Sequence, residues 1–207
     1  MAEHEIADIR SWRKAERARL LELRRTMPAS AHREAGKTIM KELRSRLPER
    51  SDALVGCYWP FRREFNCVPY MREVLRSGGR VALPVVRGRG KPLEFRCWTE
   101  TAEMEPGVWN IPHPSSGDAV TPSALVIPLV GFDDAGYRLG YGAGYYDLTI
   151  GNFTLRPFLV AVGFEFSRLP TIYPQPHDQR MDVIITEAQT RDTFAEAPGR
   201  RDDDKIA

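Results

Sequence analysis

The 207-residue sequence has few cysteines, little net charge and no long apolar run, and each shortage excludes a class of protein. Its three cysteines, Cys57, Cys67 and Cys97, are odd in number and lack the spacing of a metal site, so we expect reduced thiols in a cytoplasm. The net charge of +2 is too small to favour nucleic acid or a membrane as the main partner. No run approaches the ~20 apolar residues of a membrane helix. Residues 1–6 lack the basic and apolar parts of a secretory signal. We therefore expect a cytoplasmic globular protein.

A glycine-rich run at residues 138–147 is the most informative segment, although it lacks both common nucleotide fingerprints. It contains three glycines at every second position, which is not the Gly-x-Gly-x-x-Gly spacing of dinucleotide folds. Two tyrosines follow, where a Walker loop has lysine and serine or threonine. The apolar residues 124–132 before it predict a strand, and a short helix is expected after it. This order predicts an anion-binding loop, with a hairpin turn that holds no ligand as the alternative.

The remaining periodicity predicts an α/β fold in a single domain. Apolar segments predict strands at 54–59, 81–86, 93–98, 124–132, 159–164 and 183–186, and a helix at 68–77. We expect a central, mostly parallel mixed sheet with helices on both faces. The polar residues from 188 onward lack periodicity, and we take 1–192 as the domain and 193–207 as a flexible tail.

A pair of helices is expected at the N-terminus, at about residues 6–47. The second helix of the pair is predicted at 31–47, with Ser30 as its N-cap and Pro48 beyond its end. The first helix is basic, with the following cations: Arg10, Arg13, Lys14, Arg17, Arg19, Arg24 and Arg25. Such a helix is usually a solvated face.

The glycine run and its surroundings resemble the 5-formyltetrahydrofolate cyclo-ligase (methenyltetrahydrofolate synthetase) family. The family signature Arg-Leu-Gly-x-Gly-x-Gly-Tyr-Tyr-Asp stands intact at 138–147. Other segments that match are 58–60 with Glu64, 109–114, 132–136, 162–166, 176–178 and 181–187. The resemblance covers about residues 10–187. It implies ATP-dependent cyclisation of 5-formyltetrahydrofolate to 5,10-methenyltetrahydrofolate, with release of ADP and phosphate, through phosphorylation of the formyl oxygen and attack by N10.

The resemblance also implies a role for individual residues, none of them a covalent nucleophile. The implied ATP-binding residues are Arg13, Lys14, Arg17, Arg138, Leu139, Gly140, Tyr141, Gly142, Ala143, Gly144, Tyr145 and Tyr146. The implied substrate-binding residues are Arg17, Trp59, Glu64, Tyr141, Gly142, Ala143, Gly144 and Tyr145. The implied Mg²⁺ ligands are Asp147 and Asp178, whose hard carboxylate oxygens suit that ion. The expected partners are reduced folate and ATP, and a monomer is expected.

Taken alone, several of these residues have simpler explanations. Trp59 would more often belong to the core, and Glu64 would be a solvated loop acid. Asp147 would be an acid favoured in the first turn of a helix, and Asp178 a turn residue. His177, in a proline-rich turn, is given no role.

The chain also departs from the family pattern at the loop itself. Leu148 stands where the family often has arginine, and Ala143 where it often has lysine or glycine. Arg62 and Arg63 make the loop at Glu64 more basic than usual. These departures leave open a related ATP-using enzyme acting on another N-formyl or N-acyl substrate, or an enzyme with weakened catalysis. The basic N-terminal helix leaves open a different alternative, a non-catalytic protein that binds RNA or another acidic partner through that helix.

Overall fold

An eight-stranded mixed sheet forms the centre of the computed structural model, which describes residues 3–47 and 53–193. The order across the sheet is β12-β11-β10-β7-β1-β2-β3-β6. The bounds are β1 (Leu54–Gly56), β2 (Arg80–Val86), β3 (Leu93–Trp98), β6 (Ala119–Val120), β7 (Ala124–Pro128), β10 (Phe158–Val162), β11 (Val183–Ile185) and β12 (Thr190–Asp192). The strands from β11 through β10, β7 and β1 to β2 pair in parallel, and antiparallel pairs lie at the two edges. The expected mostly parallel mixed sheet is confirmed.

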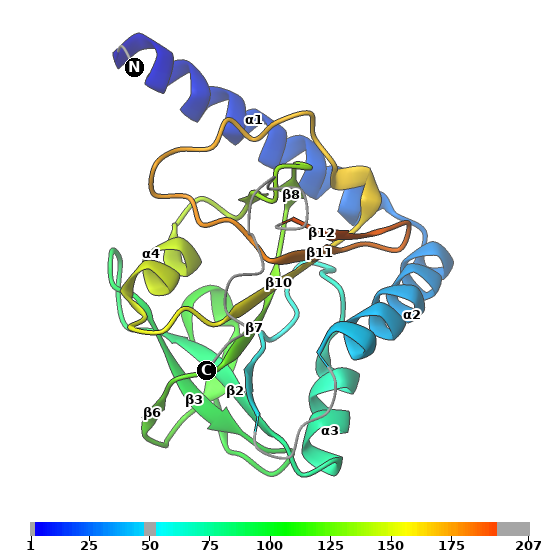
Figure 1. Cartoon of the computed structure of the whole chain (residues 1–207), viewed down its shortest axis with the longest axis vertical. Helices are drawn as coiled ribbons and strands as arrows, with labels where there is room; N and C mark the ends of the chain where they lie inside the picture. The colour runs from blue at the N-terminus through cyan, green and yellow to red at the C-terminus, as the bar shows by residue number, and fades with distance from the viewer. Residues whose placement is uncertain (1–2, 48–52, 194–207) are drawn as a thin grey trace, which may run out of the picture.

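Helices cover both faces of the sheet, as expected (Figure 1). They are α1 (Glu3–Thr26), α2 (Ala29–Arg46), α3 (Val68–Arg76) and α4 (Tyr145–Asn152). One face packs on α2 and α3, where Val126 of β7 meets Ile39 and Met71 in one apolar cluster. The opposite face, which carries Leu125, packs on Ile150 of α4. Burial on both faces explains why the parallel strands are almost continuously apolar in sequence.

The long helix α1 lies across one end of the sheet rather than on a face (Figure 1). Its Leu20 packs with Val130, Leu139 and Ile172, which all come from loops or short strands beyond the sheet. Among the described helices, none has the length and apolar character needed to cross a membrane. The two N-terminal helices therefore pack differently: α1 lies against one end of the sheet, and α2 packs on one of its faces.

Several boundaries differ from the sequence predictions for local reasons. Helix α2 begins at Ala29 after Pro28, and its start has no side-chain cap, so Ser30 is not the N-cap. A proline has its φ preset near the helical value, which lets it stand at a helix start. Residues 57–59 leave the first strand, and Tyr58 and Trp59 line a pocket instead.

The predicted strand 124–132 is two strands. Strand β7 ends at Pro128, and β8 (Gly131–Phe132) pairs with β9 (Arg138–Leu139) in a separate two-stranded ribbon. A second ribbon, β4 (Met104–Pro106) with β5 (Pro112–Pro114), was not anticipated. These pieces are too short for their periodicity to be recognised in the sequence.

The polar segment after residue 188 begins with regular structure despite its lack of periodicity, because β12 pairs with β11 along the sheet edge. Thr193, which follows it, is buried. The rest of the expected tail, 194–207, lies outside the described residues.

Candidate functional site

A pocket of about 220 Å³ opens beyond the carboxyl ends of the parallel strands. Its lining includes residues that follow β1, Pro128 at the end of β7, and the loop between β9 and α4. Ligand sites of open α/β sheets occur at this edge, because the loops that leave neighbouring strands converge there. The pocket brings together these residues singled out from the sequence: Arg13, Arg17, Trp59, Glu64, all ten residues from Arg138 to Asp147, and Asp178. Lys14 is exposed and does not belong to the lining.

The glycine loop is a tight connection between β9 and α4. Gly142 (φ 98°) and Gly144 (φ 70°) adopt left-handed backbone conformations, which residues with a side chain rarely tolerate. The loop is closed across its ends, since Arg138 Nη1 donates to Asp147 Oδ1 at 3.0 Å. Asp147 also lies in the first turn of α4, so the simpler explanation for it holds alongside the ion pair. The predicted order of strand, loop and helix is present, with a short ribbon strand in place of a long one.

Helix α1 contributes two arginines to the same pocket. Arg17 Nε donates to the carbonyl of Gly140 at 2.8 Å, and its guanidinium lies beside Gly142. Burial lowers the pKa of Arg17, and the neighbouring Arg13 charge lowers it further. Arginine keeps its proton at neutral pH even so, and two adjacent cations in a half-buried site favour an anionic ligand.

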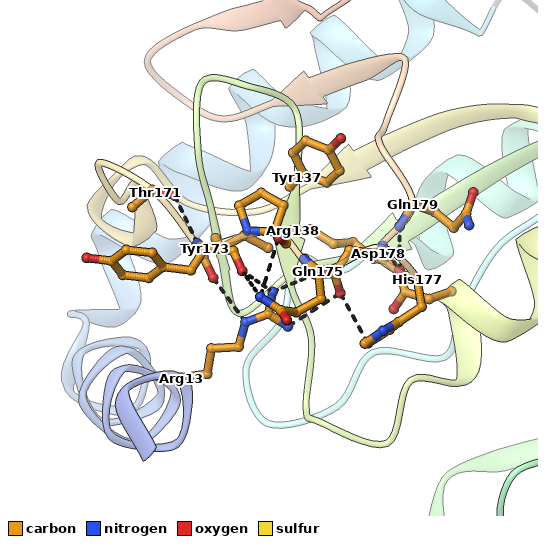
Figure 2. A network of polar contacts seen from close by, with 12 residues as sticks. Arg13, Tyr137, Arg138, Thr171, Tyr173, Gln175, His177, Asp178 and Gln179 are labelled. Atoms are coloured by element: carbon orange, nitrogen blue, oxygen red, sulfur yellow. Dashed lines mark hydrogen bonds and ion pairs between the residues drawn. The ribbon is translucent and has the colours of Figure 1, made fainter. Parts of the chain in front are cut away.

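Arg13 contacts the loop at residues 172–178 (Figure 2). Its guanidinium donates to the carbonyls of Ile172 (3.0 Å) and Tyr173 (2.9 Å) and forms an ion pair with Asp178. The Asp178 carboxylate also accepts the backbone N–H of Gln175 at 2.6 Å, which makes it a turn residue as well. Arg13 therefore fixes the position of Asp178 at the pocket edge.

One of the two predicted metal ligands, Asp147, is hydrogen-bonded to the peptide unit that follows the other, Asp178. The N–H of Gln179, the residue after Asp178, donates to Asp147 Oδ1 at 3.0 Å. Among the described residues, both hydrogen bonds to the Asp147 carboxylate fall on Oδ1, which leaves Oδ2 for another ligand. In residues 3–47 and 53–193 no group of three or more metal-ligating side chains occurs. A pair of carboxylates fits Mg²⁺ bound mainly by phosphates and water, rather than an all-protein metal cage.

Glu64 is buried at the other end of the pocket, where a solvated loop acid would have been the simpler expectation. It is 5% exposed and accepts hydrogen bonds from the Tyr141 hydroxyl (3.0 Å) and the Phe61 N–H (2.9 Å). Burial raises the pKa of Glu64 to about 7, and the charge of Arg24 opposes that rise. The turn that brings it inward includes Arg62 (φ 47°) and Arg63 (φ 58°) in left-handed conformations.

An aromatic wall, made of Phe61, Trp109 and Tyr141, stands beside Glu64. The Phe61 and Trp109 rings are stacked with centroids 6.2 Å apart, and Tyr141 lies within about the same distance of both. Trp109 is half exposed at the tip of the β4–β5 ribbon, with a left-handed backbone. Residues 109–114 resemble the family in sequence, but a role for Trp109 could not be predicted, because nothing in the sequence reveals which way a tryptophan in a loop faces.

Several other residues that line the pocket also pack against the rest of the fold. Trp59 packs against the core, contacts Trp98 at a centroid distance of 6.3 Å and also lines the pocket, so its core position does not remove it from the site. Arg138 lies over the Tyr146 ring at 5.7 Å. The Tyr146 hydroxyl is buried and has no hydrogen-bond partner among the described residues. His113 and His177 also line the pocket, and neither was assigned from the sequence.

Comparison with known proteins gives a consistent result. A model of the 5-formyltetrahydrofolate cyclo-ligase family matches residues 9–187. A Mycolicibacterium smegmatis protein named 5-formyltetrahydrofolate cyclo-ligase is 31% identical over 182 residues, which span 82% of this chain and 91% of that protein. The Escherichia coli (strain K12) protein of that name is 29% identical over 135 residues, 62% of this chain and 74% of the relative. The NMR structure of Aquifex aeolicus 5,10-methenyltetrahydrofolate synthetase has a TM-score of 0.78 at 25% identity, covering 94% of this chain and 99% of that one.

Proposed function

The chain belongs to the 5-formyltetrahydrofolate cyclo-ligase family, and from this we propose that it converts 5-formyltetrahydrofolate and ATP into 5,10-methenyltetrahydrofolate, ADP and phosphate. One observation carries the proposal. Tyr141 belongs to the glycine loop beside Arg17 and also donates its hydroxyl to Glu64, so a phosphate site and a site for a flat heterocycle share one residue. The names of the similar proteins cover the substrate and the product of this reaction.

The chemistry needs positioning and charge neutralisation more than a protein nucleophile. The formyl group on N5 is an amide, a poor electrophile whose oxygen leaves poorly. Transfer of the γ-phosphoryl group from ATP to the formyl oxygen releases ADP and makes the formyl carbon electrophilic. N10 then attacks that carbon and loses its proton, and the formyl oxygen departs within phosphate. Holding the two substrates in line supplies much of such a rate enhancement.

The ATP end of the pocket is cationic. Arg17 lies against the glycine loop, and Arg13 and Arg138 each face a carboxylate there. We assign the ATP phosphates to this end, with backbone N–H groups of the loop and these guanidinium groups as donors. Lys14 is left out of this assignment, because its exposed side chain does not line the pocket.

Asp147 and Asp178 would hold Mg²⁺ at the same end. The ion, when bound to ATP, neutralises charge that develops on the transferred phosphoryl group. The chain orients both carboxylates through Arg138, Arg13 and the N–H of Gln179.

The folate would occupy the end that carries Glu64 and the aromatic wall. A pterin ring offers N–H donors along one edge, and the ionised Glu64 carboxylate accepts such donors. Phe61, Trp109 and Tyr141 provide aromatic surface for the flat ring. Ionised Glu64 is then required, which ties activity to its pKa of about 7.

We further propose that the protein acts as a cytoplasmic monomer. All three cysteines are free, which suits a reducing compartment. The basic helix supports the enzyme over the binding-protein alternative, because Arg13, Arg17 and Arg24 turn toward the pocket region. Arg19 and Arg25 are paired with Glu16 and Glu22.

The test is to incubate the protein with 5-formyltetrahydrofolate, Mg²⁺ and ATP and to follow the absorbance of the methenyl product. Formation of product that needs ATP supports the proposal. ATP turnover without product would instead favour a related enzyme with another N-acyl substrate, an outcome that the departures at Ala143 and Leu148 make worth measuring. Binding of RNA that weakens steeply with salt, with no response to folate, would favour the non-catalytic alternative.

A further inference from the structure

Arg24 is a buried arginine of α1 that lies behind the pocket without lining it. It is 4% exposed, and its Nη1 donates to the carbonyl of Leu129 at 3.1 Å, just beyond β7. Its Nη2 donates to the Tyr141 hydroxyl at 2.6 Å. Its Nε is buried with no partner among the described residues. Keeping a guanidinium in such a place is costly, so a purely apolar packing role would be served better by leucine or methionine.

The contacts of Arg24 set the direction of a hydrogen-bond chain. A guanidinium has only donors, so the Tyr141 oxygen must accept from Arg24. The single proton of Tyr141 is then free to be donated to Glu64 Oε1, 3.0 Å away. The chain therefore runs from Arg24 through Tyr141 to Glu64, and leaves Glu64 as an acceptor at its end.

We propose that Arg24 is a positioning residue, which orients the Tyr141 hydroxyl and the Glu64 carboxylate for the folate and ties both to the sheet edge at Leu129. This inference rests on the proposed function for the identity of the ligand at Glu64. It deepens that function, because one residue outside the pocket then aligns the glycine loop of the ATP end with the carboxylate of the folate end.

The surroundings of Glu64 make Arg24 its main source of opposite charge. The other titratable groups near the Glu64 carboxylate are Tyr58 and Cys67 on the β1 side, Tyr141 on the glycine loop and Tyr146 on α4; burial raises the pKa of each of them, and the Glu64 charge raises it further. None of these is cationic. Burial raises the pKa of Glu64, and Arg24 is the largest influence that lowers it. Removing the Arg24 charge should therefore raise the pKa of Glu64 further.

The experiment is a titration of Glu64 in Arg24→Met and in the parent protein, without any substrate. Carbon-labelled glutamate gives a carboxyl NMR signal for each glutamate, and the signal missing from Glu64→Gln is that of Glu64. We expect the midpoint to rise by about one pH unit or more in Arg24→Met, the usual effect of a nearby opposite charge. The matched control is Arg25→Met, since Arg25 is the next residue but is exposed and paired with Glu22.

Two further variants make the test specific. Arg24→Lys keeps the charge but lacks the planar guanidinium that donates to both the Leu129 carbonyl and the Tyr141 hydroxyl. The Glu64 midpoint in this variant should therefore lie between those of the parent and Arg24→Met. Tyr141→Phe breaks the chain at its middle, and its raised midpoint would support the proposal even if Arg24→Met does not fold. In the pH profile of kcat/KM for the folate, the midpoint on the acid side should shift together with the Glu64 midpoint. In a Glu64→Gln background, Arg24→Met should leave that pH profile unchanged.

An unchanged Glu64 midpoint in folded Arg24→Met, or an equal rise in Arg25→Met, would overturn the proposal. Failure of the proposed function shows itself differently, as absence of the methenyl product in the parent protein. The titration needs neither ATP nor folate, so the two results are independent.

Discussion

Arg138 and Asp147, the first and last residues of the glycine run, are joined to each other by a hydrogen bond of 3.0 Å. The Arg138 side chain is 3% exposed and that of Asp147 17% exposed, so the pair is largely shielded from water. The ten-residue run is thus a loop whose two ends are joined by the ion pair between Arg138 and Asp147. The position of the Asp147 carboxylate toward the pocket follows from this closure.

Asp147→Asn should reduce ATP-dependent turnover by at least about tenfold, because an amide is a poor ligand for Mg²⁺. The amide oxygen can still accept from Arg138 and Gln179, so folding should be little affected. Steady-state rates across a range of Mg²⁺ concentrations test this. Asp192→Asn, at an exposed ion pair with Arg46, is the control. Equal activity of Asp147→Asn and the parent at every Mg²⁺ concentration would refute the metal role.

Gly142→Ala should destabilise the protein by about 1–2 kcal/mol, because the left-handed backbone there disfavours a side chain. The new Cβ would also lie 3.3 Å from Cζ of Arg17, which would have to shift and so raise the KM for ATP. Gly140→Ala is the comparison within the same loop, since a Cβ there meets nothing within 4 Å. Urea unfolding and KM measurements should show a larger loss of stability and a larger rise in the KM for ATP for Gly142→Ala than for Gly140→Ala. A larger effect of Gly140→Ala would contradict this expectation.

The stability of the protein should depend on pH through Glu64. Its pKa is raised from an ordinary 4.5 to about 7, so the folded state holds this proton more tightly than the unfolded state. The contribution of Glu64 is therefore greatest below pH 4.5 and is lost as the pH rises to about 7, by up to ~3 kcal/mol. The difference in unfolding free energy between the parent and Glu64→Gln isolates this effect. It should fall across that window, and a difference that stays constant or rises with pH would contradict the burial argument.

Trp109→Ala should raise the KM for the folate several-fold more than the KM for ATP. Trp109 is half exposed and stacked on Phe61, so its loss removes ligand contact area with little effect on the core. Leu155→Ala, at a side chain that is 83% exposed, is the control. An equal rise in both KM values would place Trp109 outside the folate end.

The parallel sheet could be predicted from the sequence because its strands are buried on both faces. Val126 and Leu125 serve opposite apolar clusters, which makes β7 continuously apolar and easy to recognise. Strands β8 and β9 have two residues each, and β12 is polar on an edge, so none of them leaves a periodic signal.

The site could be predicted only as far as local motifs reached. Arg138 to Asp147 form one contiguous run, and all of it lines the pocket. Arg24 could not be told apart from six other cations of the first helix, because its role depends on contacts with Leu129 and Tyr141, over a hundred residues away in sequence. The burial of Glu64 was hidden in the same way, since its neighbours Arg62 and Arg63 suggest a solvated loop.

We propose that this pocket transfers the γ-phosphoryl group of ATP to the formyl oxygen of 5-formyltetrahydrofolate. The most direct measurement uses substrate whose formyl oxygen is a heavy isotope, with mass analysis of the released phosphate. We expect one labelled oxygen in each phosphate, formed in equal amount with the methenyl product. Unlabelled phosphate, or no methenyl product in the presence of Mg²⁺ and ATP, would contradict it.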